Sequence, residues 1–339
     1  MHLYKRDNGI WYLKYVDDNG KIQRISTGER IKSKAFKYLI TYTPTPKQEK
    51  TRKINLSEFQ NEYLEYTKAA MTNRSICHVK HALNYLLTQF GDLPLNKIDS
   101  IMLEKDLLKY FTRTKHGAFH VYRTLKSAFN KAKKWKYLKV NPFDEFRLPK
   151  IPKKLPVFIN EKEFELILQN ITRKRIYQIS MTAFYTGMRL SEVLHLTWEQ
   201  VDLGNRMINL TNSESFVTKS KKPRSIPMCQ RVYDLFKVLR ANYKPGYPVT
   251  EDIVFYKFYG IPYSKNYLSH YFKDAVDKTG LRKGIKFHTL RHSFASMLVS
   301  RGVSLYVVKE LLGHSDFATT QIYAHLQKDA LQEAVKVFD

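Results

Sequence analysis

Transfer of a phosphoryl group without a metal makes three demands on side chains. A nucleophile must attack the phosphorus, cations must stabilise the charge of the transition state, and an acid must protonate the leaving oxygen. Arginine suits the second role, because its guanidinium stays charged and forms two hydrogen bonds to non-bridging oxygens. The C-terminal half of the sequence contains four stretches with residue types suited to these roles.

The first stretch is FYTGMRLSEVLHLTWEQVDL, residues 184–203. Gly187 can end one helix and let the next begin, which places Arg189 near a helix N-terminus. Glu192 follows Arg189 by three residues and can orient its guanidinium from the adjacent turn. The alternative is a surface ion pair, which is the more common fate of such residues.

The second stretch is FHTLRHSFASMLVSRG, residues 287–302. His288 and Arg291 are three residues apart and are expected to share one face of a helix. The spacing alone is a weak signal, because His120 and Arg123 repeat it in FHVYR. We interpret that earlier pair as a phosphate-contacting or solvated face.

The third stretch is VTKSKKPRSIPM, residues 217–228, which resembles the tip of a β-hairpin. A lysine at such a tip can reach into a DNA groove or toward a phosphate. Most lysines at hairpin tips are simply solvated, so the stretch alone does not indicate catalysis.

The fourth stretch is LLGHSDFATTQIYAHL, residues 311–326. Gly313 is expected to end a helix, and His314 to begin the segment that follows. A further helix is predicted over 317–326, with an N-cap from the SD pair before it. Alone, His314 is interpreted as a structural histidine and Tyr323 as a core aromatic.

The combination of these stretches changes that interpretation. Their local sequences resemble those of the tyrosine recombinases, the family of phage integrases, Cre and Xer, and the likeness spans nearly all of residues 156–326. The matching motifs are TGMRLSEVLHLTW, TKSKKPRSIPM, HTLRHSFASMLVSRG and LLGHSDFATTQIYAHL. The residues that match catalytic positions occur in the family's order: Arg189, Lys219, His288, Arg291, His314 and Tyr323.

The resemblance implies a role for each residue. Tyr323 would attack the scissile phosphate, giving a 3′-phosphotyrosine link and a free 5′-hydroxyl, so its own hydroxyl is expected to point out of the core. Arg189 and Arg291 would clamp the non-bridging oxygens. Lys219 would protonate the departing 5′-oxygen, although its neighbours Lys221 and Lys222 can be confused with it.

The remaining roles are supporting ones. His288 would assist proton transfer from the tyrosine, His314 would hydrogen-bond the phosphate, and Glu192 would support the site. The sequence contains no glycine-rich phosphate loop, paired Cys motif, HExxH helix or acidic cluster of the kind that holds Mg²⁺. We therefore expect neither a metal nor a cofactor.

Three regions must position these residues. Residues 1–46 contain strand patterns over 10–16 and 21–27, a DDNG turn between them and a short helix over 33–42, and they resemble an arm-binding domain. A linker is predicted over 43–53.

Residues 54–147 follow as a helical region that resembles a core-binding domain and would close a C-shaped clamp around the duplex with the catalytic domain. Helices are predicted over 56–66, 78–91, 100–111 and 119–138, with Asn55, or its rival Ser57, as the first N-cap. A second linker is predicted over 140–156. The cations expected to contact DNA, here and near the hairpin, are Arg123, Lys126, Lys131, Lys133, Lys134, Lys221, Lys222 and Arg224.

Residues 156–339 are expected to form a mixed α+β catalytic domain with a strand-like insert near 206–228. The tail after Tyr323 shows an apolar helical stripe. In the family such a tail helix often docks on a neighbouring protomer of a tetramer, and packing on its own domain is the alternative. The predicted fold class is thus multidomain and mainly α, with small β elements.

Composition agrees with a nucleic-acid partner. The 339 residues carry 58 Lys and Arg against 31 Asp and Glu, a net charge of +27. A merely basic or ribosome-associated protein is the alternative. With two distant cysteines, no secretory signal and no long apolar run, we expect a cytoplasmic, nucleoid-associated protein without membrane contact.

Three hypotheses about function remain at this point. The first is a site-specific recombinase that integrates and excises a phage or other mobile element. The second is an enzyme of the same class that resolves chromosome or plasmid dimers, as Xer proteins do. The third is a DNA-binding regulator with an inactive catalytic domain. For the first hypothesis we expect a homotetramer bound to paired double-stranded recombination sites, with DNA-bending accessory proteins as further partners.

Overall fold

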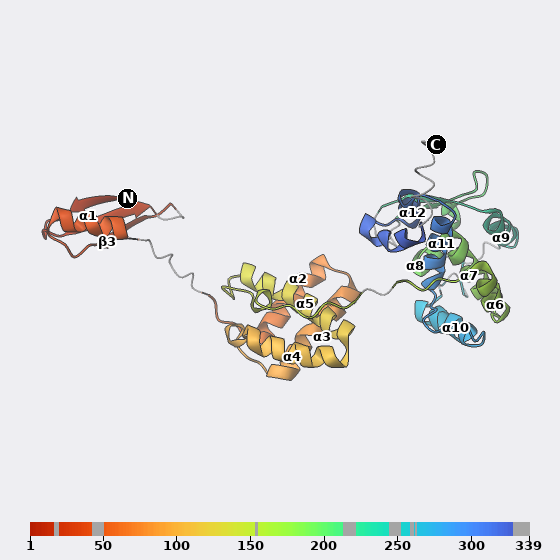
Figure 1. The fold of residues 1–339 in the computed structure, drawn as a ribbon, viewed down its shortest axis with the longest axis horizontal. Coiled ribbons are helices and arrows are strands. Elements are labelled where there is room, and N and C mark those ends of the chain that lie inside the picture. Colours follow the sequence, from red (N-terminus) through yellow and green to blue (C-terminus); the bar gives the residue numbers. More distant parts are fainter. Residues whose placement is uncertain are drawn as a thin grey trace. The chain divides into compact units, whose positions relative to one another are not determined.

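The computed structural model describes residues 1–16, 20–42, 51–152, 155–212, 222–243, 252–257, 261 and 263–327. The chain divides into two units, Met1–Pro152 and Lys153–Asp339. Figure 1 shows the helices and strands of both. Within the described ranges the chain is mainly helical with small β-sheets, which confirms the predicted fold class. No helix among those residues is long and apolar enough to cross a membrane.

The first unit begins with an antiparallel sheet in the order β1-β2-β3. Its elements are β1 (His2–Lys5), β2 (Trp11–Val16), β3 (Ile22–Ser26) and the helix α1 (Lys32–Thr41), which contacts β1 and β2. Leu13, at the centre of β2, pairs with Leu3 on one side and Ile25 on the other, and it is buried with Ala35 of α1. The predicted hairpin strands and helix are confirmed, while residues 17–19 of the predicted turn and 43–50 of the predicted linker lie outside the described ranges.

Helices make up the rest of this unit. They are α2 (Leu56–Ala70), α3 (Asn73–Phe90), η1 (Leu95–Lys97), α4 (Ser100–Arg113), α5 (Lys115–Lys134) and η2 (Pro142–Asp144). Asn55 is the N-cap of α2, and its backbone N–H donates to the Glu58 carboxylate at 3.3 Å, so the rival Ser57 is excluded. Gly91 ends α3 with a φ of 75°, as predicted.

The end of α5 differs from the prediction. The helix stops at Lys134, before the predicted end at 138, because Lys136 adopts a left-handed conformation that turns the Tyr137 ring onto Phe59. The predicted linker over 140–156 is also wrong in its first part. Phe143 and Phe146 are buried among the helices, and the Tyr122 hydroxyl donates to the Phe146 carbonyl at 2.9 Å.

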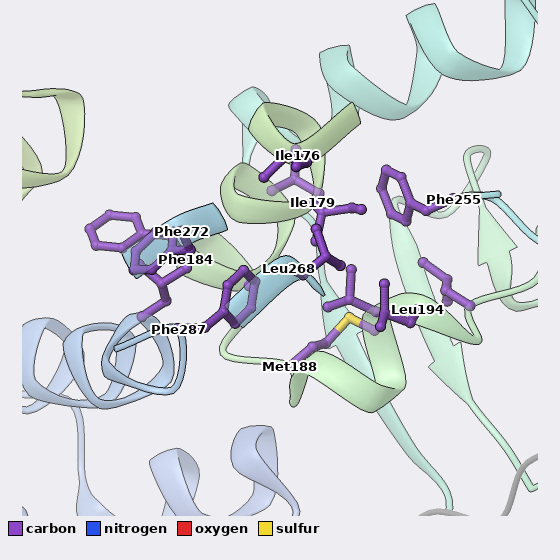
Figure 2. Close-up of a cluster of buried hydrophobic side chains, with 14 of the residues drawn as sticks. Ile176, Ile179, Phe184, Met188, Leu194, Phe255, Leu268, Phe272 and Phe287 are labelled. Atoms are coloured by element: carbon purple, nitrogen blue, oxygen red, sulfur yellow. The ribbon is translucent and has the colours of Figure 1, made fainter. Parts of the chain in front are cut away.

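The second unit contains the four sequence motifs. Its elements are α6 (Glu161–Gln169), α7 (Lys174–Thr186), α8 (Leu190–Leu194), η3 (Trp198–Gln200), β4 (Val201–Asp202), β5 (Met207–Leu210), β6 (Arg224–Pro227), α9 (Gln230–Ala241), α10 (Lys265–Asp277), α11 (Thr289–Ser300), α12 (Leu305–Leu312), η4 (Phe317–Thr319) and η5 (Gln321–Leu326). Helix α7 contacts α8, α9 and α11 and buries Ile176, Ile179 and Phe184 in the core (Figure 2). The elements that carry the site residues pack on this core.

The predicted strand-like insert is an antiparallel sheet in the order β4-β5-β6. Leu210 of β5 pairs with Arg224 of β6, which confirms the two arms of the predicted hairpin. The tip between them, residues 213–221, lies outside the described residues, and with it Lys219 and Lys221.

The predicted helix over 317–326 is wrong in type. Two short 3₁₀ segments, η4 and η5, take its place, and Thr320 between them is buried. Asp316 caps η4 by accepting from the backbone N–H of Ala318 at 3.0 Å. The apolar tail stripe beyond residue 327 lies outside the described residues.

Candidate active site

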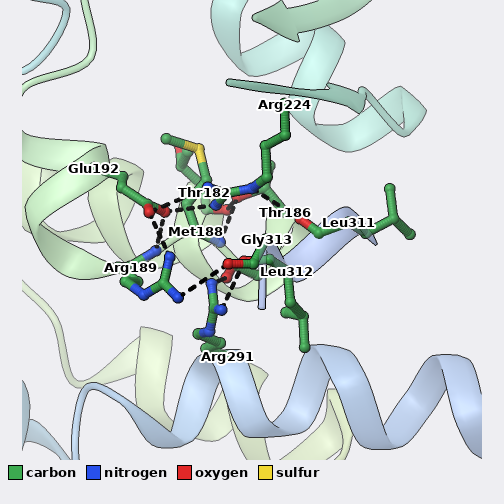
Figure 3. Close-up of polar contacts among 11 residues, drawn as sticks. Thr182, Thr186, Met188, Arg189, Glu192, Arg224, Arg291, Leu311, Leu312 and Gly313 are labelled. Atoms are coloured by element: carbon green, nitrogen blue, oxygen red, sulfur yellow. Dashed lines mark hydrogen bonds and ion pairs between the residues drawn. The ribbon is translucent and has the colours of Figure 1, made fainter. Parts of the chain in front are cut away.

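Arg189 stands at a sharp junction between two helices. Gly187 ends α7 with a φ of 65°, and a Cβ at this position would overlap the Phe294 ring, so only glycine fits. Arg189 then caps α8, as the sequence predicted. Its Nη1 donates to Glu192 Oε1 and its backbone N–H to Glu192 Oε2, both at 2.8 Å (Figure 3).

Glu192 is a buried carboxylate shared by two arginines. Besides Arg189, it accepts from Arg224 Nη2 at 2.6 Å and from Arg224 Nη1 at 3.2 Å. Burial alone would raise the pKa of Glu192, but the hydrogen bonds and charge of Arg224, followed by those of Arg189, outweigh it and bring the pKa to about 2. The carboxylate is therefore ionised at neutral pH, and a surface ion pair is excluded because the residue is only 1% exposed.

Arg291 approaches from α11 and is also buried. It donates from Nη1 to the Gly187 carbonyl at 2.8 Å and from Nη2 to the Leu312 carbonyl at 2.7 Å. Burial, and then the charge of Arg189, lower the pKa of Arg291 to about 9, so it remains a cation at neutral pH. Two guanidinium groups thus bind the Glu192 carboxylate, while that of Arg291 binds backbone carbonyls. The three positive charges outnumber the single negative charge, which suits an anion.

Two histidines complete the cluster. His288 is the residue before α11, and its ring lies 4.8 Å from that of His292, centroid to centroid. His314 follows Gly313, the left-handed C-cap of α12, and its Nδ1 lies 2.9 Å from Thr320 Oγ1. Burial, and then the nearby arginines, lower the pKa of His314 to about 3, so its ring is neutral at neutral pH. When the Thr320 hydroxyl donates to Nδ1, the ring proton lies on Nε2, where it can serve a phosphate oxygen.

These side chains line one open pocket of about 490 Å³. Its walls include Arg189, Arg291, His288 and His314, from motifs more than a hundred residues apart in the sequence. Lys265, the first residue of α10, also lines it and was missed from the sequence, where YSKNYL carries no motif. No group of three or more His, Cys, Asp or Glu side chains that could hold a metal ion occurs in the described part of the chain.

Tyr323 does not lie where the sequence predicted. Its side chain is 1% exposed and packs against Val299, Val308 and Leu312, and it is not among the residues that line the pocket. Its hydroxyl is 2.6 Å from Nδ1 of His292. The prediction that the hydroxyl points out of the core is therefore wrong, because apolar residues of α11 and α12 enclose the ring. Burial also raises the pKa of Tyr323 to about 12.

His292 was missed as a site residue, although it stands next to Arg291 within a quoted motif. The available signal was its position one helical turn after His288. Burial, and then the charge of Arg291, lower the pKa of His292. A neutral imidazole can accept the hydrogen bond of the Tyr323 hydroxyl.

Comparison with known proteins decides the family. The family model described as "Phage integrase family" matches residues 157–330, about half of the chain. The chain belongs to the phage integrase family of tyrosine recombinases. It is 32% identical to the tyrosine recombinase XerC of Pediococcus pentosaceus over 58% of this chain and 67% of that one. It is 31% identical to XerD of Staphylococcus aureus over 63% and 73%.

Solved recombinases share its fold. The Tn1549 transposon integrase in complex with transposon right-end DNA matches with a TM-score of 0.72 and 22% identity, covering 84% of this chain and 99% of that one. A lambda integrase dimer bound to a COC′ core site matches with a TM-score of 0.65 and 17% identity, covering 97% and 95%.

Among the predicted DNA contacts, Arg224 needs correction, and Lys126 has a partner within the fold. Arg224 is not a surface cation, since its side chain is 7% exposed and its guanidinium is committed to Glu192 and to the Leu311 carbonyl. Lys126 is bound to Asp144 and to the Phe143 carbonyl, each at 2.9 Å, because η2 folds back over α5. Lys131 lies over the Tyr66 ring at 3.8 Å, while Arg123, Lys133, Lys134 and Lys222 are exposed.

Proposed function

We propose that the chain is a site-specific DNA recombinase that cuts and rejoins DNA through a 3′-phosphotyrosine intermediate. The observation that carries this proposal is the convergence of Arg189 and Arg291 on one pocket with His288 and His314. One buried cation, one partly buried cation and a neutral imidazole suit the charge that develops on the non-bridging oxygens of a phosphate under attack.

Each step of the reaction has a candidate residue. The Tyr323 oxygen attacks phosphorus and gives up its proton with the help of His288, while Arg189, Arg291 and His314 hold the non-bridging oxygens. The bond from phosphorus to the 5′-oxygen breaks, and that oxygen takes a proton from Lys219, which lies outside the described residues. A 5′-hydroxyl of a second duplex reverses the steps. The phosphotyrosine conserves the energy of the broken bond, so no nucleotide is consumed.

The buried position of Tyr323 makes the described arrangement a resting one. Its hydroxyl must leave His292 and enter the pocket before it can reach a phosphate. The short 3₁₀ segments η4 and η5, which carry Tyr323, are the elements whose rearrangement would allow this movement.

We infer further that the enzyme is of the integrase type and serves a phage or other mobile element. The match to lambda integrase covers 97% of this chain and so extends over the N-terminal sheet, whereas the matches to XerH and to a fragment of the Tn1549 integrase each cover 84%. The additional coverage favours a role for the N-terminal sheet as an arm-binding domain. Lambda integrase is described as a tetramer on a Holliday junction. A tetramer with exchanged tails, and DNA-bending partners, belong to the same proposal.

Covalent capture tests the proposed reaction. The full-length protein is incubated with a library of duplexes that carry a nick and a randomised core, and the adducts that survive denaturation are recovered and sequenced. We expect an adduct with a defined core, lost in Tyr323→Phe and retained in Tyr306→Phe, whose ring is exposed on α12. Tight and sequence-selective binding to duplexes of the library, without any adduct, would instead favour the regulator.

Recombination between plasmids tests the integrase proposal. We expect the recovered core to recombine efficiently only with flanking DNA attached. In Lys14→Ala and Arg24→Ala, both in the N-terminal sheet, the flanking DNA should no longer increase recombination. Efficient resolution of two bare cores, unaffected by these variants, would favour dimer resolution.

A further inference from the structure

Arg224 is a buried arginine that contacts two separate parts of the candidate site. It opens strand β6, directly after the hairpin segment that carries Lys219. Its Nη1 and Nη2 donate to the two carboxylate oxygens of Glu192, and its Nε donates to the Leu311 carbonyl at 3.0 Å (Figure 3). One planar group therefore holds the carboxylate with one edge and the end of α12 with another.

The first contact determines how Arg189 is held. Oε1 of Glu192 accepts from Nη1 of Arg189 and from Nη1 of Arg224, while Oε2 accepts from the Arg189 backbone N–H and from Nη2 of Arg224. Both oxygens are thus shared, and the plane of the carboxylate follows from the two guanidinium groups together. Without Arg224, Glu192 would keep its charge but lose the partner that fixes its orientation.

The second contact supports the loop that carries His314. A Cβ on Gly313 would lie 2.8 Å from Cδ and 2.9 Å from Nη1 of Arg224, so the side chain lies directly against the Gly313 backbone. The Gly313 carbonyl in turn accepts from Nη2 of Arg189 at 3.4 Å. Displacement of Arg224 would therefore release the segment that precedes His314 as well as Arg189.

We propose that Arg224 is a positioning residue for the phosphate pocket. It connects β6 to Arg189 through the carboxylate of Glu192. It also connects β6 to His314 through the backbone of Leu311 and Gly313. A lysine in its place retains a cation beside Glu192, but its single ammonium group lacks the fork that reaches the carboxylate and the carbonyl at once. This inference rests on the proposed recombinase function, since the pocket must act on a phosphate for its geometry to affect a rate.

The test measures single-turnover cleavage by full-length variants on the core recovered by covalent capture. The variants are Arg224→Lys and Arg224→Gln, with Arg231→Ala as a matched control, because Arg231 is an exposed arginine of the same unit paired with Glu165 at 3.5 Å. We expect both Arg224 variants to bind the duplex with unchanged affinity and to cleave it at least about tenfold more slowly, as misplaced catalytic groups do. Arg231→Ala should cleave at the wild-type rate.

A second substrate separates this role from general acid catalysis. It carries sulfur in place of the bridging 5′-oxygen, so its leaving group needs no proton. We expect the Arg224 variants to remain slow on it, whereas Lys219→Ala regains most of its rate.

Three outcomes would overturn the proposal. They are wild-type cleavage by Arg224→Lys, recovery of the Arg224 variants on the sulfur substrate, and loss of DNA binding by both variants, which would make Arg224 a residue of the fold alone. A wild-type protein without any adduct would refute the recombinase function itself, and is thereby distinguished from failure of this inference.

Discussion

The candidate nucleophile and the candidate phosphate pocket are separated by one hydrogen bond. His292 holds the Tyr323 hydroxyl at 2.6 Å inside a cluster of apolar side chains, while its own ring packs against His288 of the pocket. Leaving a buried hydroxyl without a hydrogen-bond partner costs about 1–3 kcal/mol. His292 therefore stabilises the resting position of the tyrosine relative to the position required for attack.

Removal of this partner gives the first prediction at the residue scale. In His292→Phe the ring still fills the space, but the Tyr323 hydroxyl is left buried without its acceptor. We expect the tyrosine to leave the cluster more readily, and covalent adducts to form several-fold faster in single-turnover assays. An equal rate would refute the restraint by His292, and a slower rate would show that His292 acts in the reaction itself, for instance as the acceptor of the phenol proton.

The neutral state of His314 gives a second prediction. Its folded pKa of about 3 lies below the value of 6.5 expected for an unperturbed histidine, so between these pH values the unfolded chain binds a proton that the folded chain does not. The folded state should lose stability as the pH falls through this range. His292, whose pKa is also lowered, acts in the same direction, whereas Glu192 contributes only below its unperturbed value of 4.5.

We therefore expect His314→Gln to reduce the loss of stability between pH 7 and pH 5, measured by urea unfolding at both values. The window lies above the titration of Glu192 and so reports on the histidines. Parallel losses in the variant and the wild type would contradict the assignment of a buried, neutral His314.

At the scale of elements, the junction between α7 and α8 positions Arg189. Gly187 has a φ of 65°, and a Cβ there would overlap Phe294 and touch Leu312. Gly280 has nearly the same φ, 69°, but nothing lies within 4 Å of its Cβ position. The two glycines thus separate the cost of the backbone conformation from the cost of the overlap.

We expect Gly280→Ala to lower the free energy of unfolding by about 1 kcal/mol. Gly187→Ala should lower it by a further 1–3 kcal/mol, roughly, because Phe294 or the junction must move. It should also slow cleavage, since Arg189 follows two residues later. Equal losses in the two variants, by chemical unfolding, would refute the close packing of α7 against α11.

The elements also show what the sequence could predict. Helix boundaries at Asn55, Gly91 and Gly187 follow from local capping chemistry, so they were predicted correctly. The burial of Arg224 was not, because it depends on Glu192, more than thirty residues earlier.

The position of Tyr323 has the same kind of cause. The apolar residues of its stretch fit a helical period, but the backbone forms two short 3₁₀ segments, and the buried Thr320 between them contacts His314. The sequence motifs thus indicated which residues belong to the site. The direction in which each side chain points depends on tertiary contacts that the motifs do not contain.

At the scale of the whole molecule, the net charge of +27 must be divided between cations that are paired internally and cations available to DNA. Helix α5 contains both kinds. Lys126 is bound to Asp144, whereas Lys133 and Lys134 are exposed in the last turn. A cation that is already neutralised releases few additional counterions from DNA, so the exposed pair should contribute to the salt dependence of binding and Lys126 should not.

This division leads to a prediction with an internal control. For the double variant Lys133→Ala and Lys134→Ala, the slope of log affinity against log salt should become shallower by about 1.8, since each phosphate contact contributes about 0.9. Lys126→Ala should leave the slope unchanged. Binding is measured by fluorescence anisotropy on a labelled duplex across a series of salt concentrations. A shallower slope in Lys126→Ala alone would mean that its pair with Asp144 opens on DNA and that α5 meets the duplex through its middle turns instead of its end.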